Sequence, residues 1–362
     1  MANQTTSADK AVPQYVLDHA PLVYLFSTDP YRPSSFAATL ANTRPQIGFK
    51  DVSVPASPLT LDNLDQLNSV GAKGGEDVYL ASIVDVTTSP AWLNGIQPDA
   101  NGGTGGKTTC AIIVVDKGKD AVDAFYIYFW AFNWGGVVLG NQLGDHFGDW
   151  EHNMIRFVNG QPTAIWYSSH ANGAAYTFSA VQKDASGKRP IAYAANGSHA
   201  LYPTPGLHDH TIPNLPLPAP LLLVDDTDAG PRYDPLLSAY FYSYTPSSSS
   251  FAAAAPTPDA PTAWLRYKGR WGDEEYPASD RRQKNLFGNK KFVGGPTGPA
   301  DKQLGRKEVW PENAWSAGQR LRERVDDGGK GKVKEWFEKL NCFGKGKGKA
   351  VTRVKVSGEV VG

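Results

Sequence analysis

The stretch Ala124-Phe-Tyr-Ile-Tyr-Phe-Trp-Ala-Phe132 is a dense run of aromatic and apolar residues, which favours a strand. It leads through Asn133-Trp-Gly-Gly136 to a second stretch, Gly144-Asp-His-Phe-Gly-Asp-Trp-Glu-His152. Five of the nine residues of that second stretch can carry charge or bind a metal ion. An apolar strand pattern over residues 153–158 follows at once. We therefore expect a charged cluster at the point where a turn enters a strand.

Further short strand patterns occur on both sides of these stretches, over residues 21–26, 78–84, 110–115, 164–169, 176–181 and 191–195. The 37 glycines and 27 prolines supply the turns between them. Leucines and a valine at three-residue spacing predict a helix over residues 61–70, and residues 333–340 have the spacing of an amphipathic helix. The chain is thus predicted to be mainly β, an antiparallel β-sandwich with peripheral helices and long loops.

The length and composition indicate one large domain over residues 1–340 and a basic tail rich in Gly and Lys over residues 341–362. The region near residues 246–262 has low complexity, which predicts a surface insertion rather than a packed element, and residues 213–220 are proline-rich and should be extended. We see no signal peptide and no run of eighteen apolar residues, so we expect a soluble, cytoplasmic protein without a transmembrane segment.

Lys and Arg together number 36, as do Asp and Glu, so the formal net charge is zero and no nucleic-acid footprint is indicated. The two cysteines, Cys110 and Cys342, are too far apart in sequence to suggest a disulfide framework or a thiolate metal site. The sequence does not indicate an oligomeric state.

The charged cluster has the residue types of a metal site. Because alternate residues of a strand share a face, Asp149 and Glu151 should project together, with Trp150 and His152 on the opposite side. A turn at residues 147–148 would bring in His146, and His170 follows the strand expected over residues 164–169. Two carboxylates with imidazole suit Mg²⁺, Ca²⁺ or Mn²⁺ in preference to Zn²⁺. We therefore predict a divalent cation bound by His146, Asp149, Glu151 and His170.

Six of the seven histidines lie between positions 146 and 210, in or next to turn-rich segments. Four residues in these segments are candidates for contacting the molecule that the cation would bind: His199, His208, Asp209 and His210. Histidines in short polar loops also serve structural roles. His152, on the other face, is expected to be a core histidine.

Two other patterns are rejected. The Gly-rich segment over residues 101–109 has Asn101 where a phosphate loop needs its first glycine, and it leads into a strand rather than a helix. It is read as a flexible loop. No Gly-x-Ser-x-Gly elbow accompanies Ser168 and Ser169, so the sequence gives little support to nucleophilic catalysis.

From about residue 15 to residue 312 the chain resembles the vacuolar protein sorting-associated protein 62 family. The motifs come in the family's order: residues 21–25 (PLVYL), 144–152 (GDHFGDWEH), 196–202 (NGSHALY), 205–210 (PGLHDH), 228–235 (DAGPRYDP), 269–273 (GRWGD), 295–299 (GPTGP) and 304–306 (LGR). The family name implies a part in delivering proteins to the vacuole. Association with vacuolar or endosomal membranes is therefore left open.

A shorter resemblance links residues 144–151 to the necrosis- and ethylene-inducing peptide-like proteins, whose Gly-His-Arg-His-Asp-Trp-Glu motif on a β-sandwich helps to hold a divalent cation that binds a sphingolipid head group. Its His, Asp and Glu correspond to His146, Asp149 and Glu151, and its downstream His resembles His170. The motif's second His is Gly148 here, and Asn133 is the nearest candidate for the upstream Asp ligand.

Three functions remain in competition. The first is a binding protein whose cation receives a sugar or a phosphate-like head group. The second is a metal-dependent hydrolase or cyclase acting on a small metabolite, with Glu151 or His208 as the acid or base. The third is a trafficking adaptor that uses the proline-rich segment or the basic tail.

Overall fold

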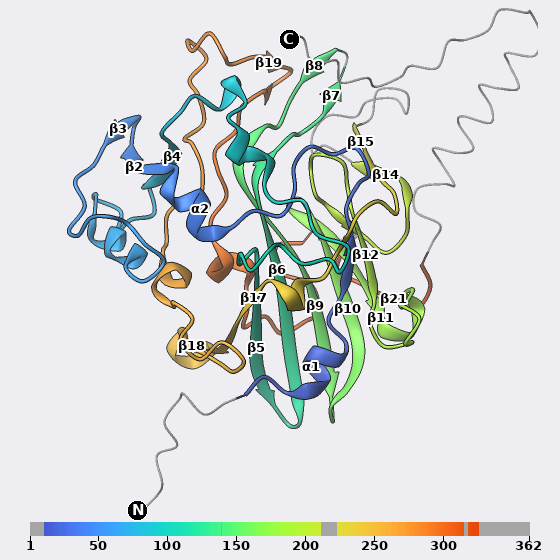
Figure 1. Ribbon diagram of the computed structural model, residues 1–362. Coiled ribbons are helices and arrows are strands. Elements are labelled where there is room, and N and C mark those ends of the chain that lie inside the picture. The colour runs from blue at the N-terminus through green and yellow to red at the C-terminus, as the bar shows by residue number, and fades with distance from the viewer. Residues whose placement is uncertain (1–10, 139, 211–222, 315–317, 326–362) are drawn as a thin grey trace, which may run out of the picture.

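The computed structural model describes residues 11–138, 140–210, 223–314 and 318–325. Its framework is an eight-stranded sheet whose long central strands are β5 (Cys110–Gly118), β6 (Ala121–Asn133), β9 (His146–Val158) and β10 (Gln161–Ser169). These strands run side by side through the middle of the molecule (Figure 1). β6 and β9 pair antiparallel along their whole length. The prediction of a mainly β fold is confirmed.

The order of strands in this sheet is β18 (Ser250–Ala253), β17 (Ala239–Thr245), β5, β6, β9, β10, β11 (Asn172–Thr177) and β21 (Leu321–Arg322). The sheet is mixed, because β17 pairs with β5 and β11 pairs with β21 in parallel, while its other pairs are antiparallel. Within the low-complexity region near residues 246–262, β18 pairs with β17 at the edge of the sheet. The ring of Phe251 lies 4.7 Å from that of Tyr244, which joins this edge strand to its neighbour.

A four-stranded sheet covers one face of the large sheet and forms the second layer of the sandwich. Its order is β13 (Leu201–Tyr202), β12 (Ile191–Ala194), β1 (Leu22–Tyr24) and β16 (Arg232–Tyr233), with β1 and β12 parallel. Between the layers lies a core that includes Tyr126, Tyr128 and Trp130 of β6, all fully buried. This aromatic row is therefore part of the core.

Loops and short helices cover the opposite face. They include α2 (Phe36–Ala41) and the 3₁₀ helices Leu64–Ser69 and Ala263–Arg266, and the core beneath them holds Trp150, Trp264 and Trp271. The helix expected over residues 61–70 is shorter than predicted and is a 3₁₀ helix. Its three-residue apolar spacing fits the three residues per turn of that helix better than the 3.6 of an α-helix.

The remaining elements border this framework. They are α1 (Gln14–Asp18), β2 (Thr43–Ile47), β3 (Lys50–Asp51), β4 (Tyr79–Ser82), β7 (Val137–Val138), β8 (Asn141–Gln142), β14 (Gly206–His210), β15 (Leu223–Thr227), β19 (Asn285–Leu286), β20 (Asn289–Lys290) and the 3₁₀ helices Val86–Thr88, Ala91–Asn94, Phe178–Ala180, Pro235–Leu237, Pro246–Ser248 and Pro299–Lys302. The strand expected over residues 176–181 ends at Thr177, where a 3₁₀ helix begins.

Several predictions fall outside the described residues: the amphipathic helix over residues 333–340, the tail over residues 341–362 and the extended segment over residues 213–220. In the part of the chain that the structure describes, no helix has both the length and the apolar character needed to cross a membrane.

Candidate functional site

β9 presents its two acidic side chains toward the four-stranded sheet. Asp149 and Glu151 occupy alternate positions of the strand and are almost completely buried. Trp150 projects to the other side, where its ring stacks on that of Trp264 with centroids 5.8 Å apart. The distribution of side chains predicted from strand alternation is therefore confirmed.

His146 reaches the acidic face by a different route from the one expected. β9 runs through Phe147 and Gly148 without a turn, but Gly148 has a φ of +74°, which interrupts the regular alternation. His146 then donates from Nδ1 to the carbonyl oxygen of Gly148 at 2.6 Å. Burial lowers the pKa of His146, with Asp149 close enough to oppose that shift.

Only glycine fits at position 148. A Cβ built there would lie 2.0 Å from the carbonyl oxygen of Trp271. Gly272 faces the same crossing, since its Cβ would lie 2.0 Å from the carbonyl oxygen of Phe147. Two backbone segments thus cross in direct contact, and their contact fixes the bend in β9 that places His146.

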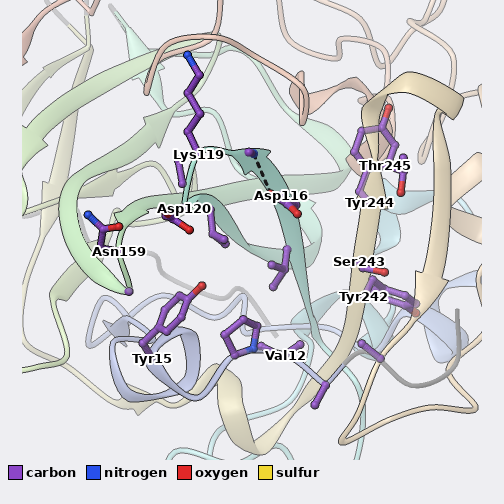
Figure 2. A pocket seen from close by; sticks show the side chains of 18 residues that line it. Val12, Tyr15, Asp116, Lys119, Asp120, Asn159, Tyr242, Ser243, Tyr244 and Thr245 are labelled. Atoms are coloured by element: carbon purple, nitrogen blue, oxygen red, sulfur yellow. Dashed lines mark hydrogen bonds between the residues drawn. The ribbon is translucent and has the colours of Figure 1, made fainter. Parts of the chain in front are cut away.

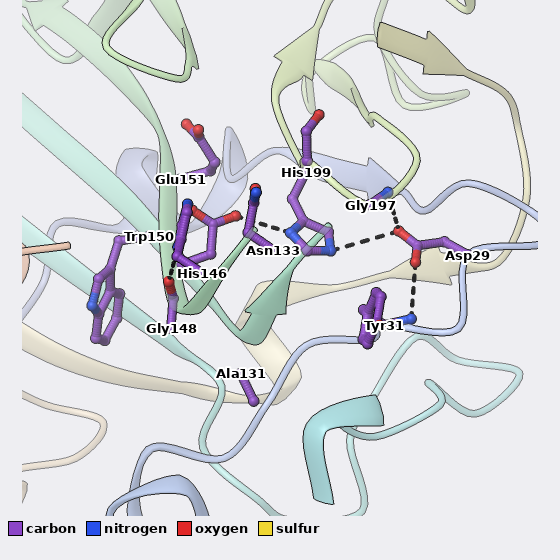
Figure 3. Close-up of polar contacts among 12 residues, drawn as sticks. Asp29, Tyr31, Ala131, Asn133, His146, Gly148, Trp150, Glu151, Gly197 and His199 are labelled. Atoms are coloured by element: carbon purple, nitrogen blue, oxygen red, sulfur yellow. Dashed lines mark hydrogen bonds and ion pairs between the residues drawn. The ribbon is translucent and has the colours of Figure 1, made fainter. Parts of the chain in front are cut away.

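Asp149 is held by a buried line of polar groups. His199 donates from Nδ1 to the Asp149 carboxylate at 2.9 Å, and its Nε2 lies 3.6 Å from Asp29 (Figure 3). The His199 ring stacks on Trp130 with centroids 4.5 Å apart. Burial opposes ionisation of Asp149, but the hydrogen bond and the charge of His199 outweigh it and lower the pKa of Asp149. His199 therefore orients this carboxylate.

Glu151 has a different environment. Its carboxylate accepts hydrogen bonds from the Ser168 hydroxyl and, at 3.0 Å, from the backbone N–H of His170. Burial and the nearby charge of Asp149 raise the pKa of Glu151 to about 7. The pKa of Glu151 is thus raised while that of Asp149 is lowered, and Asp149 accepts a hydrogen bond from an imidazole.

His170 joins this group to a second layer of contacts. Its Nε2 donates to Asp225 at 2.8 Å, and that carboxylate also accepts hydrogen bonds from Ser198 and Tyr202, each at 2.6 Å. Burial would lower the pKa of His170, but Asp225 and the other carboxylates raise it to about 9. His170 and His199 both have positive φ values, 57° and 56°, a strained conformation that tends to occur at functional sites.

His152 belongs to the core on the opposite face, as expected. Its ring stacks on Phe125, and its Nε2 accepts a long hydrogen bond of 3.5 Å from Arg306. Burial lowers the pKa of His152 well below its usual value, with Arg306 acting in the same direction. It does not face the acidic side chains of β9.

A cavity of about 430 Å³ opens beside the site. Its lining includes Asn133, His146 and His170, together with Glu275 and Lys290. Asn133 donates from its side chain to the carbonyl oxygen of Gly144 at 3.0 Å, and Figure 3 shows it beside His146. Asn133 therefore lines the same cavity as His146.

The other histidine-bearing loop lies apart from this cavity. His208 is buried, donates from Nε2 to the carbonyl oxygen of Thr204 at 3.0 Å and stacks on Tyr202 with centroids 3.8 Å apart. Through Tyr202 it is linked to Asp225, the carboxylate that also holds His170. Asp209 and His210 belong to β14, but their side chains are outside the described part of the structure.

The structure brings the four predicted ligands near one another without closing them on a single point. His146 and His170 line the same cavity, and the backbone N–H of His170 donates to the carboxylate of Glu151, which stands two positions from Asp149 on β9. Within the described ranges, however, no group of three or more His, Cys, Asp or Glu side chains is arranged to hold a metal ion. The donors have the chemistry of a hard-cation site, but not yet its geometry.

Sequence reasoning missed the carboxylates that support the site. Asp29 and Asp225 hold His199 and His170, yet each lies far along the chain from the residues it contacts. Asp29 precedes a proline and Asp225 stands in the run Asp225-Asp-Thr-Asp228, and neither context signals a site. Only the packing of distant segments of the chain reveals their role.

A second cavity, of about 660 Å³, contains none of the predicted site residues. Tyr15, Asp116, Lys119, Asp120 and Tyr244 contribute to its lining (Figure 2). It lies by the turns that join β5 to β6 and β9 to β10, whereas His146 stands at the opposite end of β9.

Two solved structures show some likeness to this chain. Necrosis and Ethylene inducing Protein 2 from the causal agent of cocoa's Witches Broom disease is 12% identical, with a TM-score of 0.26 over 54% of this chain and 69% of that one. The non-toxic HaNLP3 protein is 11% identical, with a TM-score of 0.29 over 84% of this chain and 94% of that one. TM-scores this low support no conclusion about the site.

Relatives in sequence are much closer. The profile of the family described as vacuolar protein sorting-associated protein 62 matches residues 136–212, which include the candidate site on β9. The putative vacuolar protein sorting-associated protein TDA6 of Saccharomyces cerevisiae is 35% identical over 339 residues, which cover 85% of this chain and 71% of that protein. Vacuolar protein sorting-associated protein 62 of the same yeast is 34% identical over 324 residues, covering 84% and 68%. This chain therefore belongs to the vacuolar protein sorting-associated protein 62 family.

Proposed function

We propose that the chain is a divalent-cation-dependent binding protein with a part in the targeting of proteins to the vacuole. The cation would be held by His146, Asp149, Glu151 and His170, and it would be Mg²⁺, Ca²⁺ or Mn²⁺ rather than Zn²⁺. The observation that carries the proposal is the burial of two carboxylates side by side on β9, beside a cavity lined by His146 and His170.

The burial of Asp149 and Glu151 needs compensation. Removing two neighbouring carboxylates from water is costly unless positive charge or hydrogen bonds replace the lost hydration. Asp149 has His199, whereas the Glu151 carboxylate accepts hydrogen bonds from the Ser168 hydroxyl and a backbone N–H. A cation shared by the two carboxylates would relieve their mutual repulsion.

His146 is prepared for a ligand role by its own hydrogen bond. Because Nδ1 donates to the carbonyl oxygen of Gly148, the neutral ring keeps its lone pair on Nε2. Fixing one ring nitrogen on a backbone carbonyl is the usual way in which proteins orient a metal-binding histidine. Burial, which lowers the pKa of His146, favours this neutral form.

The donors must move closer together for the ion to be bound. The proposal requires Asp149 and Glu151 to turn toward a common point while His199 keeps its hold on Asp149. It also requires the ion to displace the proton that Asp225 and the other carboxylates stabilise on His170. The open position of the ion would then face the cavity of about 430 Å³, a volume within the usual range of small-ligand sites. A sugar or a phosphate-like head group offers the oxygen ligands that such an ion prefers.

Metal analysis of the purified protein tests the cation site. We expect about one divalent ion per chain after equilibration with Mg²⁺, Ca²⁺ or Mn²⁺, and its loss in Asp149→Asn, which keeps the shape of the side chain. Asp116→Asn is the matched control, because Asp116 is an exposed carboxylate in β5. Unchanged ion binding in Asp149→Asn, measured by isothermal titration calorimetry, would refute the proposed ligand set.

The vacuolar part of the proposal is supported by the names of the two yeast relatives. Its test is to express this chain in Saccharomyces cerevisiae lacking both relatives and to measure secretion of a vacuolar hydrolase. If the loss of both relatives increases secretion, the wild-type chain should reduce it and Asp149→Asn should not. If the wild-type chain and Asp149→Asn reduced secretion equally, the sorting role would not depend on the cation site.

A further inference from the structure

The hairpin formed by β19 and β20 ends in an exposed aromatic side chain. Phe287 is 73% exposed, the highest value among the exposed large apolar residues of the described chain. It occupies a two-residue turn with Gly288, and its φ of 52° lies in the left-handed region. Most two-residue hairpins place Asn, Asp or Gly at such a position, because other side chains are strained there.

Neither packing nor turn chemistry explains a phenylalanine at this tip. Gly288 donates from its backbone N–H to the side chain of Asn285 at 2.8 Å, so the turn is closed without help from the Phe287 ring. An exposed apolar ring costs solubility, and a left-handed φ at a bulky residue costs conformational energy. Because the fold does not need Phe287, both costs indicate that its ring contacts something other than this chain.

Basic residues flank this tip. Arg281 and Lys284 are exposed before β19, and Lys291 follows β20 with its ammonium group 5.0 Å from the centre of the Phe292 ring. Within the described residues none of these three side chains forms an ion pair, although Arg281 helps to lower the pKa of Asp280 and Lys291 opposes the rise in the pKa of Asp145. Lys290 is paired with Glu275. The hairpin therefore combines an apolar tip with positive charge behind it.

The base of the hairpin is fixed to the molecule. The backbone N–H groups of Gly144 and Asp145 donate to the carbonyl oxygens of Lys290 and Lys291 at 2.9 and 2.7 Å. Figure 1 shows β19 at the same end of the molecule as β7 and β8, and Val137 of β7 is 52% exposed. A hairpin with a fixed base and an exposed apolar tip can insert that tip into an apolar surface outside the protein.

We infer that the β19–β20 hairpin inserts Phe287 into the surface of a lipid bilayer with anionic head groups, while Lys284 and Lys291 contact those head groups. An aromatic ring prefers the boundary between head groups and acyl chains, and lysine ammonium groups are attracted to anionic lipid. A single apolar tip binds weakly, so the interaction is reversible. It does not require the cation site.

Vesicle co-sedimentation of the full-length chain in EDTA tests this inference. Wild type should bind vesicles of phosphatidylcholine with phosphatidylserine, and bind phosphatidylcholine alone much more weakly. Phe287→Ser should weaken binding at least about tenfold, the factor expected for burial of an aromatic side chain. Lys284→Ala and Lys291→Ala should each weaken it about fivefold, since each basic residue near an anionic membrane contributes about 1 kcal/mol.

Phe49→Ser provides the matched control. Phe49 also stands in a hairpin turn with a positive φ, of 62°, but it is less exposed, at 42%, and its ring lies 6.3 Å from that of Tyr276. The Phe49→Ser variant should bind vesicles as tightly as the wild type. Equal binding by wild type and Phe287→Ser, equal loss in Phe49→Ser, or equal binding to neutral and anionic vesicles would each overturn the inference.

A direct readout uses Phe287→Trp. Its added fluorescence should shift to the blue and be quenched by brominated lipid when anionic vesicles are present, whereas Phe49→Trp should show neither change. Sedimentation of the wild type without vesicles would indicate self-association through the tip instead, and would contradict the inference. Circular dichroism shows whether each variant remains folded.

Discussion

Replacing Gly148 with alanine should destabilise the protein strongly, because two separate costs coincide there. The φ of +74° disfavours any residue with a Cβ, by roughly 1–2 kcal/mol. The new Cβ would also lie 2.0 Å from the carbonyl oxygen of Trp271, and overpacking of this kind costs about 1–3 kcal/mol. The sum is a loss of about 2–5 kcal/mol in the free energy of unfolding.

Gly118→Ala separates the two costs. Gly118 has a similar φ of +69°, but a Cβ there would meet nothing within 4 Å. It should therefore lose only the conformational part, roughly 1–2 kcal/mol. The smaller entropy of the unfolded alanine chain helps both variants equally and cancels in the comparison.

Urea unfolding followed by tryptophan fluorescence measures both variants against the wild type. The midpoint for Gly148→Ala should fall well below that for Gly118→Ala, with similar slopes. If the two variants were equally stable, the close crossing of β9 and the Trp271 backbone would not constrain the strand. The account of how His146 is positioned would then fail as well.

Two further predictions concern buried charge. Arg156 makes paired hydrogen bonds of 2.7 and 2.8 Å to the fully buried Asp123, so Arg156→Leu should lower the free energy of unfolding in urea by about 3 kcal/mol. Arg266→Leu, which breaks an exposed ion pair with Asp65, should lower it by less than about 1 kcal/mol. Equal losses in the two variants would refute the role of burial. Burial lowers the pKa of His152, so the unfolded chain binds a proton more readily than the folded one. His152 should therefore contribute a loss of stability as the pH falls below about 6.5, approaching about 1.4 kcal/mol per pH unit. In EDTA, the stability of His152→Gln should fall less steeply with acid than that of wild type, and parallel curves would contradict the assignment.

The long strands and the direction of their side chains could be predicted from the sequence. β5, β6, β9 and β10 begin or end close to where apolar runs and turns place them, because strand periodicity is a local property. The same alternation correctly placed Asp149 and Glu151 opposite Trp150 and His152. The three-residue apolar spacing in the sequence is also consistent with the 3₁₀ geometry of Leu64–Ser69.

The partners of the site could not be predicted in this way. His199 meets Asp149 across 50 positions of the chain, and Asp225 meets His170 across 55. Such contacts depend on how the segment between β12 and β13 and the β14–β15 hairpin lie on the eight-stranded sheet, which no local pattern specifies. The left-handed φ of Gly148 likewise depends on contact with a backbone segment more than a hundred positions away.

The sequence by itself thus determined which residues form strands, which faces they occupy and to which family the chain is related. The tertiary structure alone decided how the candidate ligands are held: His146 by the bend at Gly148, Asp149 by His199, and His170 by Asp225. The reason is physical. Alternation along a strand follows from the geometry of a single chain, whereas the hydrogen bonds and burial that orient a side chain come from segments brought together only by packing.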